Sequence, residues 1–347
     1  SVSGFTTTGF SIIHNVNNID EPLLLWRSTS QWMGGLLFLL VTIGTIGSKQ
    51  IRIKPAYLIS GGASGRNFYN NFNYNFIKIL LIYFSSTIFV IFLYSLMDLR
   101  LLDSVNLAFT TISSGGFIPS DNLSNIIISN LQTFIFSITL LFPIFNFFLL
   151  YDVITGRFLF KNHHEDLHIG LLIISLTLFF YFLIIPEEGF SNVLFAIISS
   201  ISTSGITTYS SNLDLSLFFI LLTIVGGSLI STSSGFKYTR IYILLKISYQ
   251  EIYRLAKPIN VIDKNLYNSE VKIDDQDLKI AFLVFLSFII SVFILSSILT
   301  LDYLSFENSF KLSILTLTNT VSSTLYGMDN LSFLDLNNFT KMSLILF

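Results

Sequence analysis

Six apolar stretches of this chain are long enough to cross a lipid bilayer, and this feature constrains its fold most strongly. A helix needs about 20 predominantly apolar residues to cross a hydrocarbon core of roughly 30 Å. Charged residues make up only 12% of the 347 residues. We therefore expect an all-α integral membrane protein with spans at Leu23–Gly47, Phe76–Met97, Ile126–Leu150, His168–Ile185, Leu215–Leu245 and Lys279–Leu301, and the start of another at Leu334–Phe347.

Three shorter apolar pieces lie between the spans, and each ends in a loop rich in small hydroxyl residues. They are Ser104–Ile112, Asn192–Ile201 and Phe310–Leu317. Because they are too short to cross the membrane, we interpret them as re-entrant half-helices. Their expected N-caps, at or just before their first turns, are Asp103, Ser191 and Asn308.

Four loops of this kind recur along the chain. Their sequences are Thr7-Thr8-Gly9, Ser114-Gly115-Gly116, Thr203-Ser204-Gly205 and Thr320-Val321-Ser322, so Ser322 is expected where the other three loops have their last glycine. Their wide spacing indicates duplicated units rather than a solenoid. The predicted architecture is four pseudo-repeats of helix, re-entrant half-helix, filter loop and helix around a central pore, at residues 1–60, 70–162, 163–262 and 275–347. The first and last units are incomplete, so we interpret the chain as a fragment of a longer protein.

The loops have the chemistry of a cation filter. Non-helical backbone at membrane depth persists only where it is buried in protein or lines water, and four loops around one axis meet that condition. Each half-helix directs the partial negative charge of its C-terminus, roughly half an elementary charge, at its loop. Backbone carbonyls can then replace the water shell of a cation. One such loop would be an ordinary turn, but its repetition favours a filter that conducts K⁺ and needs no other cofactor.

The distribution of Lys and Arg predicts the orientation in the membrane. Most of the 19 basic residues fall in the segments 49–78, 157–161 and 237–279, which follow the second helix of each unit. Cytoplasmic loops carry such an excess, so this side is predicted to be cytoplasmic. The half-helices then enter from the outside. The location that follows is the cell membrane, in bacteria the inner membrane.

A second polar segment interrupts the fifth span. It contains Gly226, Gly227, Ser228, Ser231, Thr232, Ser233, Ser234 and Gly235 and ends at Lys237. A flexible polar segment just inside the filter could obstruct the pore. The same residues could instead form a small-residue face for helix packing. The sequence alone leaves both interpretations open.

Other chemistry finds little support. The chain has no cysteine, which excludes disulfides and thiolate metal sites, and its net charge of −2 gives no reason to expect nucleic acid as a partner. His163, His164 and His168 lie near acidic residues, but a solvated interfacial loop explains them better than a metal site. No pairing of nucleophile and base stands out, so we do not expect an enzyme.

Several motifs together resemble the Trk/Ktr/HKT potassium transporters, most closely the TrkH-type membrane subunit. The first is the loop Thr6–Ser11, which is followed by Leu24–Ser28 and Gln31–Gly35. The intramembrane segment Gly227–Lys237, with Arg240 after it, is similar to the family's gating loop, and Glu251–Pro258 to the basic segment that follows. The resemblance implies one pore per subunit, a homodimer in the lipid bilayer and a cytoplasmic regulatory subunit that binds nucleotides.

Three hypotheses about function follow. The leading one is a pore subunit for potassium uptake, gated by the intramembrane segment and by the regulatory partner. The second is a sodium-permeable or weakly selective cation pathway of the same architecture, since Ser322 stands where the family usually has a filter glycine. The third, from another class, is a membrane-embedded enzyme that uses the three histidines.

Overall fold

The computed structural model describes residues 2–13, 15–46, 72–156, 163–184, 189–208, 215–256, 273, 275–302, 304–328, 333–334 and 336–347, and within them the only regular elements are helices. Of the predicted basic segments 49–78, 157–161 and 237–279, residues 49–71, 157–161 and 257–272 lie outside the described residues. The elements are α1 (Val2–Phe5), η1 (Val16–Asn18), α2 (Glu21–Ile46), α5 (Phe72–Ser95), α6 (Leu101–Ser113), η2 (Leu123–Asn125), α7 (Asn130–Thr139), α8 (Phe147–Ile154), α9 (His164–Phe179), η4 (Phe180–Ile184), α10 (Phe190–Ile201), α11 (Ser216–Val225), α12 (Tyr238–Ala256), α13 (Asp275–Thr300), α14 (Phe306–Leu317), η6 (Thr324–Tyr326) and α15 (Asn338–Leu346).

The three predicted half-helices are present as α6, α10 and α14, but they begin earlier than expected. Their N-caps are Arg100, Gly189 and Ser305, and only the Ser305 hydroxyl accepts a capping bond, from Asn308 N at 3.3 Å. The expected caps Asp103, Ser191 and Asn308 therefore lie inside the first turns. Asp103 lies in the first turn of α6, where its negative charge complements the helix dipole. A capping residue and a first-turn acidic residue give similar sequence patterns.

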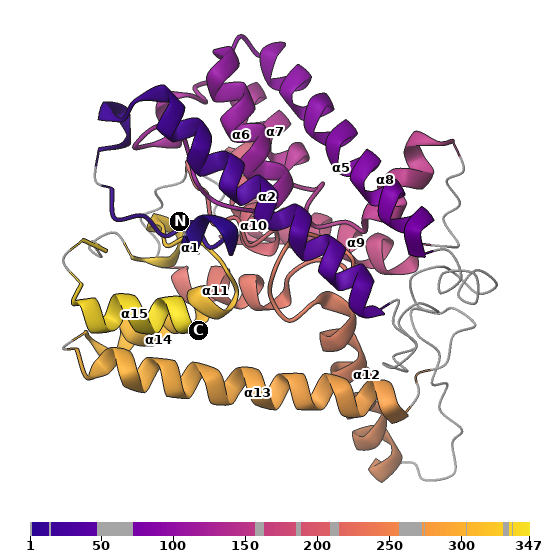
Figure 1. Ribbon diagram of the computed structural model, residues 1–347. Coiled ribbons are helices and arrows are strands. Elements are labelled where there is room, and N and C mark those ends of the chain that lie inside the picture. The colour runs from indigo at the N-terminus through magenta and orange to yellow at the C-terminus, as the bar shows by residue number, and fades with distance from the viewer. Residues whose placement is uncertain are drawn as a thin grey trace.

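Each half-helix packs in the same way against its neighbours. The half-helix α6 lies against α5 and α2, α10 lies against α9 and α7, and α14 lies against α13 and α11. In Figure 1, α2 and α5 run diagonally through the upper half of the view, while α13 lies at the bottom, below α14 and α15. This arrangement directs the ends of α1, α6, α10 and α14 toward a common region in the middle of the molecule.

The predicted span Ile126–Leu150 is not one continuous helix, which corrects that expectation. α7 ends at Thr139 and α8 begins at Phe147, with turns between them around Pro143. Proline has no backbone N–H and its ring clashes with the preceding turn, so the helix ladder fails here. The freed backbone groups find partners in the segment after α11, described below.

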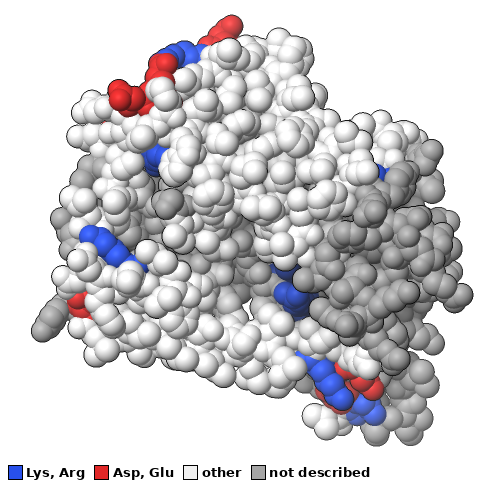
Figure 2. Space-filling view, in the orientation of Figure 1, with Lys and Arg blue, Asp and Glu red and all other residues white. Residues whose placement is uncertain are grey.

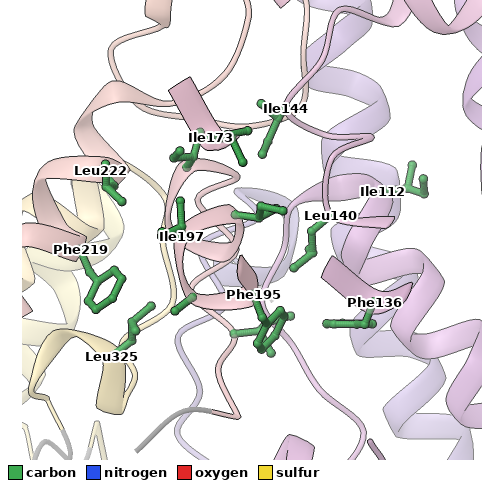
Figure 3. Packing of buried hydrophobic residues seen from close by; sticks show 14 of the residues in the cluster. Ile112, Phe136, Leu140, Ile144, Ile173, Phe195, Ile197, Phe219, Leu222 and Leu325 are labelled. Carbon is green, nitrogen blue, oxygen red and sulfur yellow. The ribbon is translucent and has the colours of Figure 1, made fainter. Parts of the chain in front are cut away.

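The hydrophobic core surrounds α10. Phe195 and Ile197 of this helix lie between Phe136 and Leu140 on one side and Phe219, Leu222 and Leu325 on the other (Figure 3). The Phe136 and Phe195 rings have centroids 5.5 Å apart and both side chains are fully buried. The packing holds the half-helix of the third unit rigidly between α7 and α11.

The surface matches a protein that crosses a membrane. Among the described residues, three helices are long and apolar enough to span by length and composition: Phe76–Ser95, His164–Ile184 and Asp275–Thr300. Large apolar side chains such as Leu81, Ile88 and Phe92 of α5 are exposed. Most of the face in Figure 2 carries no charged side chain. Burial in lipid is the environment in which such a surface is stable.

Candidate ion pathway

A residue with a left-handed backbone closely follows each of the three half-helices α6, α10 and α14 and the short helix α1. The φ angles are 59° at Thr7, 59° at Ser114, 60° at Thr203 and 46° at Asn319. Side chains rarely adopt this region, where each non-glycine residue costs about 1–2 kcal/mol. Four such residues at equivalent places indicate that the surrounding structure imposes the same turn four times.

The turn has a recurring hydrogen bond. Thr8 N donates to Ser3 O at 3.0 Å, Gly115 N to Thr110 O at 2.9 Å and Thr320 N to Leu315 O at 2.9 Å, each across five residues. The next residue in the first three loops is a glycine with positive φ: 78° at Gly9, 91° at Gly116 and 65° at Gly205. The three glycines are therefore required by backbone conformation.

The loops meet through their backbones. A methyl group on Gly9 would lie 2.7 Å from the Gly115 carbonyl oxygen, and one on Gly116 would lie 2.7 Å from the Ser204 carbonyl oxygen. A methyl group on Gly205 would lie 2.6 Å from the Val321 carbonyl oxygen. Loops separated by many residues thus bring carbonyl oxygens together, as the filter hypothesis requires.

The fourth loop differs in register from the sequence expectation. In the first three loops, the glycine lies two residues after the left-handed residue Thr7, Ser114 or Thr203. In the fourth loop, the residue two positions after the left-handed Asn319 is Val321 and not Ser322. The shared hydrogen bond of Thr320 gives the same count. In the sequence, either Val321 or Ser322 can be aligned with the last glycine of the other three loops. The position at which α14 ends decides between the two alignments.

Side chains link the loops on the side of the half-helix ends. Thr8 Oγ1 donates to Asn319 Oδ1 at 3.1 Å, and Asn319 Nδ2 donates to Ser234 Oγ at 3.3 Å. Ser234 N donates to Thr203 Oγ1 at 2.8 Å. The intramembrane segment therefore contacts the third and fourth units directly below the loops, and Asn319 connects it to Thr8 of the first unit.

The intramembrane segment also pairs with the broken helix of the second unit. Ser228 N donates to Ile144 O at 2.8 Å, Ser233 N donates to Pro143 O at 3.0 Å and Phe147 N donates to Ile230 O at 3.0 Å. Two interrupted helices thus satisfy each other's backbone groups at membrane depth, where a free group costs several kcal/mol. This pairing is the physical reason that both interruptions are stable.

A buried lysine and a half-buried glutamate hold this segment in place. Lys237 is 6% exposed, and its Nζ donates to Ser231 O at 3.1 Å, Ser231 Oγ at 3.0 Å and Ser233 O at 2.5 Å. Glu165 Oε1 accepts from Leu229 N at 3.1 Å and from the Thr239 hydroxyl. Lys237 thus links residues within the segment. Glu165, which belongs to α9, links the segment to α9 and α12.

Gln31 of α2 supports the second loop from behind, a role that sequence reasoning did not assign. Its side chain is fully buried, with Nε2 donating to Gly115 O at 2.8 Å. Its Oε1 accepts from Phe117 N at 3.2 Å and from Thr110 Oγ1 at 3.4 Å. A glutamine inside an otherwise apolar span was the available signal, because buried polar side chains need partners.

Replacing Gln31 by methionine is expected to lower cation discrimination. The variant keeps the side-chain volume but leaves Phe117 N and Gly115 O unpaired, which costs about 1–3 kcal/mol for each buried group. The second loop should then relax, and the ratio of rubidium to sodium uptake by the full-length protein should fall. Thr29→Val in the same helix is the control, because the half-buried Thr29 hydroxyl donates to Leu25 O of its own helix. An unchanged ratio in Gln31→Met would contradict the supporting role.

A cavity of about 300 Å³ lies on the other side of the loops. Its lining includes Gly9, Gly116 and Gly205, together with Val321 and Ser322. Arg27 also lines it, 8% exposed, with its guanidinium 4.4 Å from the centroid of the Phe117 ring. The loops therefore separate an open cavity on one side from the intramembrane segment on the other.

The histidines lie elsewhere. His163 Nε2 is 3.1 Å from Asp152 Oδ2, and His163 Nδ1 is 3.7 Å from Asp166 Oδ2. In the part of the chain that the structure describes, no group of three His, Cys, Asp or Glu residues could hold a metal ion. His163 instead joins α8 to the start of α9 as a structural contact.

Comparison with known proteins extends these observations. No protein-family model matches the sequence. The chain is 28% identical over 340 residues to an uncharacterized cation transporter of Methanocaldococcus jannaschii, covering 89% of this chain and 65% of that protein. It is 27% identical over 282 residues to the Trk system potassium uptake protein TrkH of Halomonas elongata, covering 76% of this chain and 57% of that protein. The chain thus spans less than two thirds of these relatives.

The fold has a solved counterpart. The crystal structure of the potassium transporter TrkH from Vibrio parahaemolyticus matches with a TM-score of 0.82 and 22% identity, over 99% of this chain and 73% of that one. Fold and candidate site together define a multi-pass, all-helical membrane protein of the TrkH-like fold. The chain is thus similar in sequence and fold to cation transporters, among them TrkH proteins of the Trk potassium uptake system. These similar proteins are named as transporters, and none of them supports the hypothesis of a membrane-embedded enzyme.

Proposed function

We propose that the chain forms a cation-conducting pore for potassium uptake, built from four pseudo-repeats around one axis. The observation that carries the proposal is the meeting of the loops at Gly9, Gly116, Gly205 and Val321, with carbonyl oxygens at each of the three contacts described. The half-helices place their partial negative ends at this point. A pore that uses the membrane potential needs no ATPase chemistry in this chain.

A weakly selective or sodium-permeable pathway is the second candidate, and the fourth loop favours it. Val321 lacks the positive φ of the three glycines, so its carbonyl is aimed differently from theirs. Selectivity depends on the number and direction of the coordinating carbonyls. We therefore expect sodium to compete with potassium in this protein more than it would in a filter with four glycines.

The segment Gly226–Lys237 is proposed as the gate. It lies next to the inner ends of the loops, and its contacts to Thr203, Asn319 and Ile112 would obstruct an ion leaving the filter. It leads directly into α12, whose far end carries Glu251 and Arg254 on the surface. A cytoplasmic nucleotide-binding regulatory subunit acting on α12 could move the gate, and a homodimer in the membrane is proposed from the family resemblance.

Uptake by cells tests the proposal. The full-length protein should restore growth and rubidium uptake to cells that lack potassium uptake systems, and sodium should reduce that uptake. Replacing His164 and His168 together by glutamine should leave uptake unchanged. Absence of uptake, with the protein present in the membrane, would contradict the proposed function.

A further inference from the structure

The side chain of Val321 occupies the centre of the ring of loops. A methyl group on Gly9 would lie 3.1 Å from Val321 Cβ, and one on Gly116 would lie 2.9 Å from the same atom. A methyl group on Gly205 would lie 3.0 Å from Val321 Cγ1. The three glycines belong to three different units, so one isopropyl group that touches all of them lies near their common axis.

The position of Val321 is fixed by its neighbours. The preceding residue, Thr320, is fully buried and donates its N–H to Leu315 O at 2.9 Å, at the end of α14. Two residues later, Ser323 O accepts from Tyr326 N at 3.0 Å, and Tyr326 is fully buried. A valine has one strongly restricted side-chain torsion, so it cannot fold away as a longer side chain could.

Val321 faces the cavity and not the lipid. It is one of the residues that line the 300 Å³ cavity, with Gly9, Gly116 and Gly205. A partly exposed apolar group in this position meets water and, in a conducting protein, meets the ion. The Val321 side chain is half-buried, does not belong to the hydrophobic core and lies beside three glycines of the other loops.

We propose that Val321 is an apolar constriction that limits cation entry into the filter and weakens its selectivity. This inference rests on the proposed function as a cation pore. An ion at this level must shed water beside an isopropyl group that offers no oxygen, and hydrophobic constrictions of this kind gate pores by excluding water. Potassium and sodium both meet this barrier, so the site slows conduction while discriminating little between them.

Four variants of the full-length protein in vesicles test the inference by potential-driven rubidium uptake. Val321→Gly should raise the rate by about tenfold and Val321→Ala by about threefold, since each removes part of the apolar group. Val321→Thr has nearly the same volume as valine and adds a hydroxyl, so it should also conduct faster than wild type. Ser322→Gly, one residue on, tests the register and should raise the rate less than Val321→Gly does.

The outcomes separate the two proposals. If wild type conducts and the three Val321 variants conduct at the wild-type rate, the constriction is contradicted while the pore stands. If Val321→Thr conducts no faster than wild type, the apolar character of the Val321 side chain does not limit conduction. This outcome holds even if Val321→Gly alters the fold, because threonine has nearly the volume of valine. If Ser322→Gly raises the rate and Val321→Gly does not, the register is wrong and the inference falls. Uptake equal to that of empty vesicles in every variant and in wild type would overturn the pore and the constriction together.

Discussion

Replacing Gly116 by alanine is expected to lower cation flux through the full-length protein by at least about tenfold, which corresponds to about 1.4 kcal/mol. Gly116 has a φ of 91°, and a methyl group there would lie 2.7 Å from the Ser204 carbonyl oxygen and 2.9 Å from Val321 Cβ. The first obstacle is backbone, which cannot yield without turning the carbonyl away from the axis. Flux should therefore fall for two reasons. Alanine is strained at this positive φ, and the Ser204 carbonyl oxygen no longer points toward the axis.

Gly170→Ala is the matched control for this experiment. Gly170 lies in α9, and a methyl group there would meet nothing within 4 Å. Alanine is also favoured over glycine inside a helix by up to about 1 kcal/mol. Full rubidium uptake by Gly170→Ala beside a loss in Gly116→Ala would support the filter. Equal uptake by both variants would show that Gly116 does not shape the ion path.

Deleting Leu229–Ser233 is expected to raise flux in the absence of any regulatory partner, by about tenfold or more if this segment closes the pore. The deletion removes the bonds from Ser233 N to Pro143 O and from Thr232 Oγ1 to Ile112 O. It also removes all three acceptors of Lys237 Nζ. Ser234 remains, but without these bonds the shortened segment should no longer be held beneath the filter loops.

The ends of the segment lie close enough for this deletion to be tolerated. Phe236 N donates to Ile224 O at 2.8 Å and Tyr238 N donates to Gly227 O at 3.0 Å, so α11 and α12 are already joined at the base of the segment. Lys237→Met is a milder companion that keeps the chain length and should give a smaller rise. If the deletion variant reaches the membrane intact and its flux without the partner equals that of wild type, the segment packs helices and is no gate.

The half-helices and their loops could be predicted from sequence because they depend on local chemistry. A short apolar helix that ends in Ser, Thr and Gly is stable in a membrane only where the loop after it is buried in protein or lines water. The helices α6, α10 and α14 each end in such a loop. The exact starts were missed. Arg100 and Gly189 cap without a side-chain bond, so no residue type marked them.

The pairing of two broken helices could not be predicted in this way. Pro143 marked a weak point in its own span, but the partners of its neighbours lie far along the chain, at Ser228 and Ser233. Which backbone groups pair across that distance is decided by tertiary packing. The same holds for Glu165, whose acceptor role depends on the meeting of α9, α12 and the intramembrane segment.

The register of the fourth loop shows a third limit. Val321-Ser322 contains no glycine, so residue type alone could not say which position carries the turn. The left-handed Asn319 and the end of α14 decide it. This one-residue difference changes the residue at the axis from a small hydroxyl to an apolar side chain, with the consequences for conduction proposed above.

Potential-driven rubidium uptake into vesicles that contain the full-length wild-type protein tests the central claim most directly. An inside-negative potential of about 100 mV contributes about 2.3 kcal/mol per charge, which favours accumulation by about 50-fold. A pore of the kind proposed should carry rubidium toward that limit, faster as the potential increases, and potassium should compete. Uptake no greater than that of empty vesicles at every potential would contradict the account.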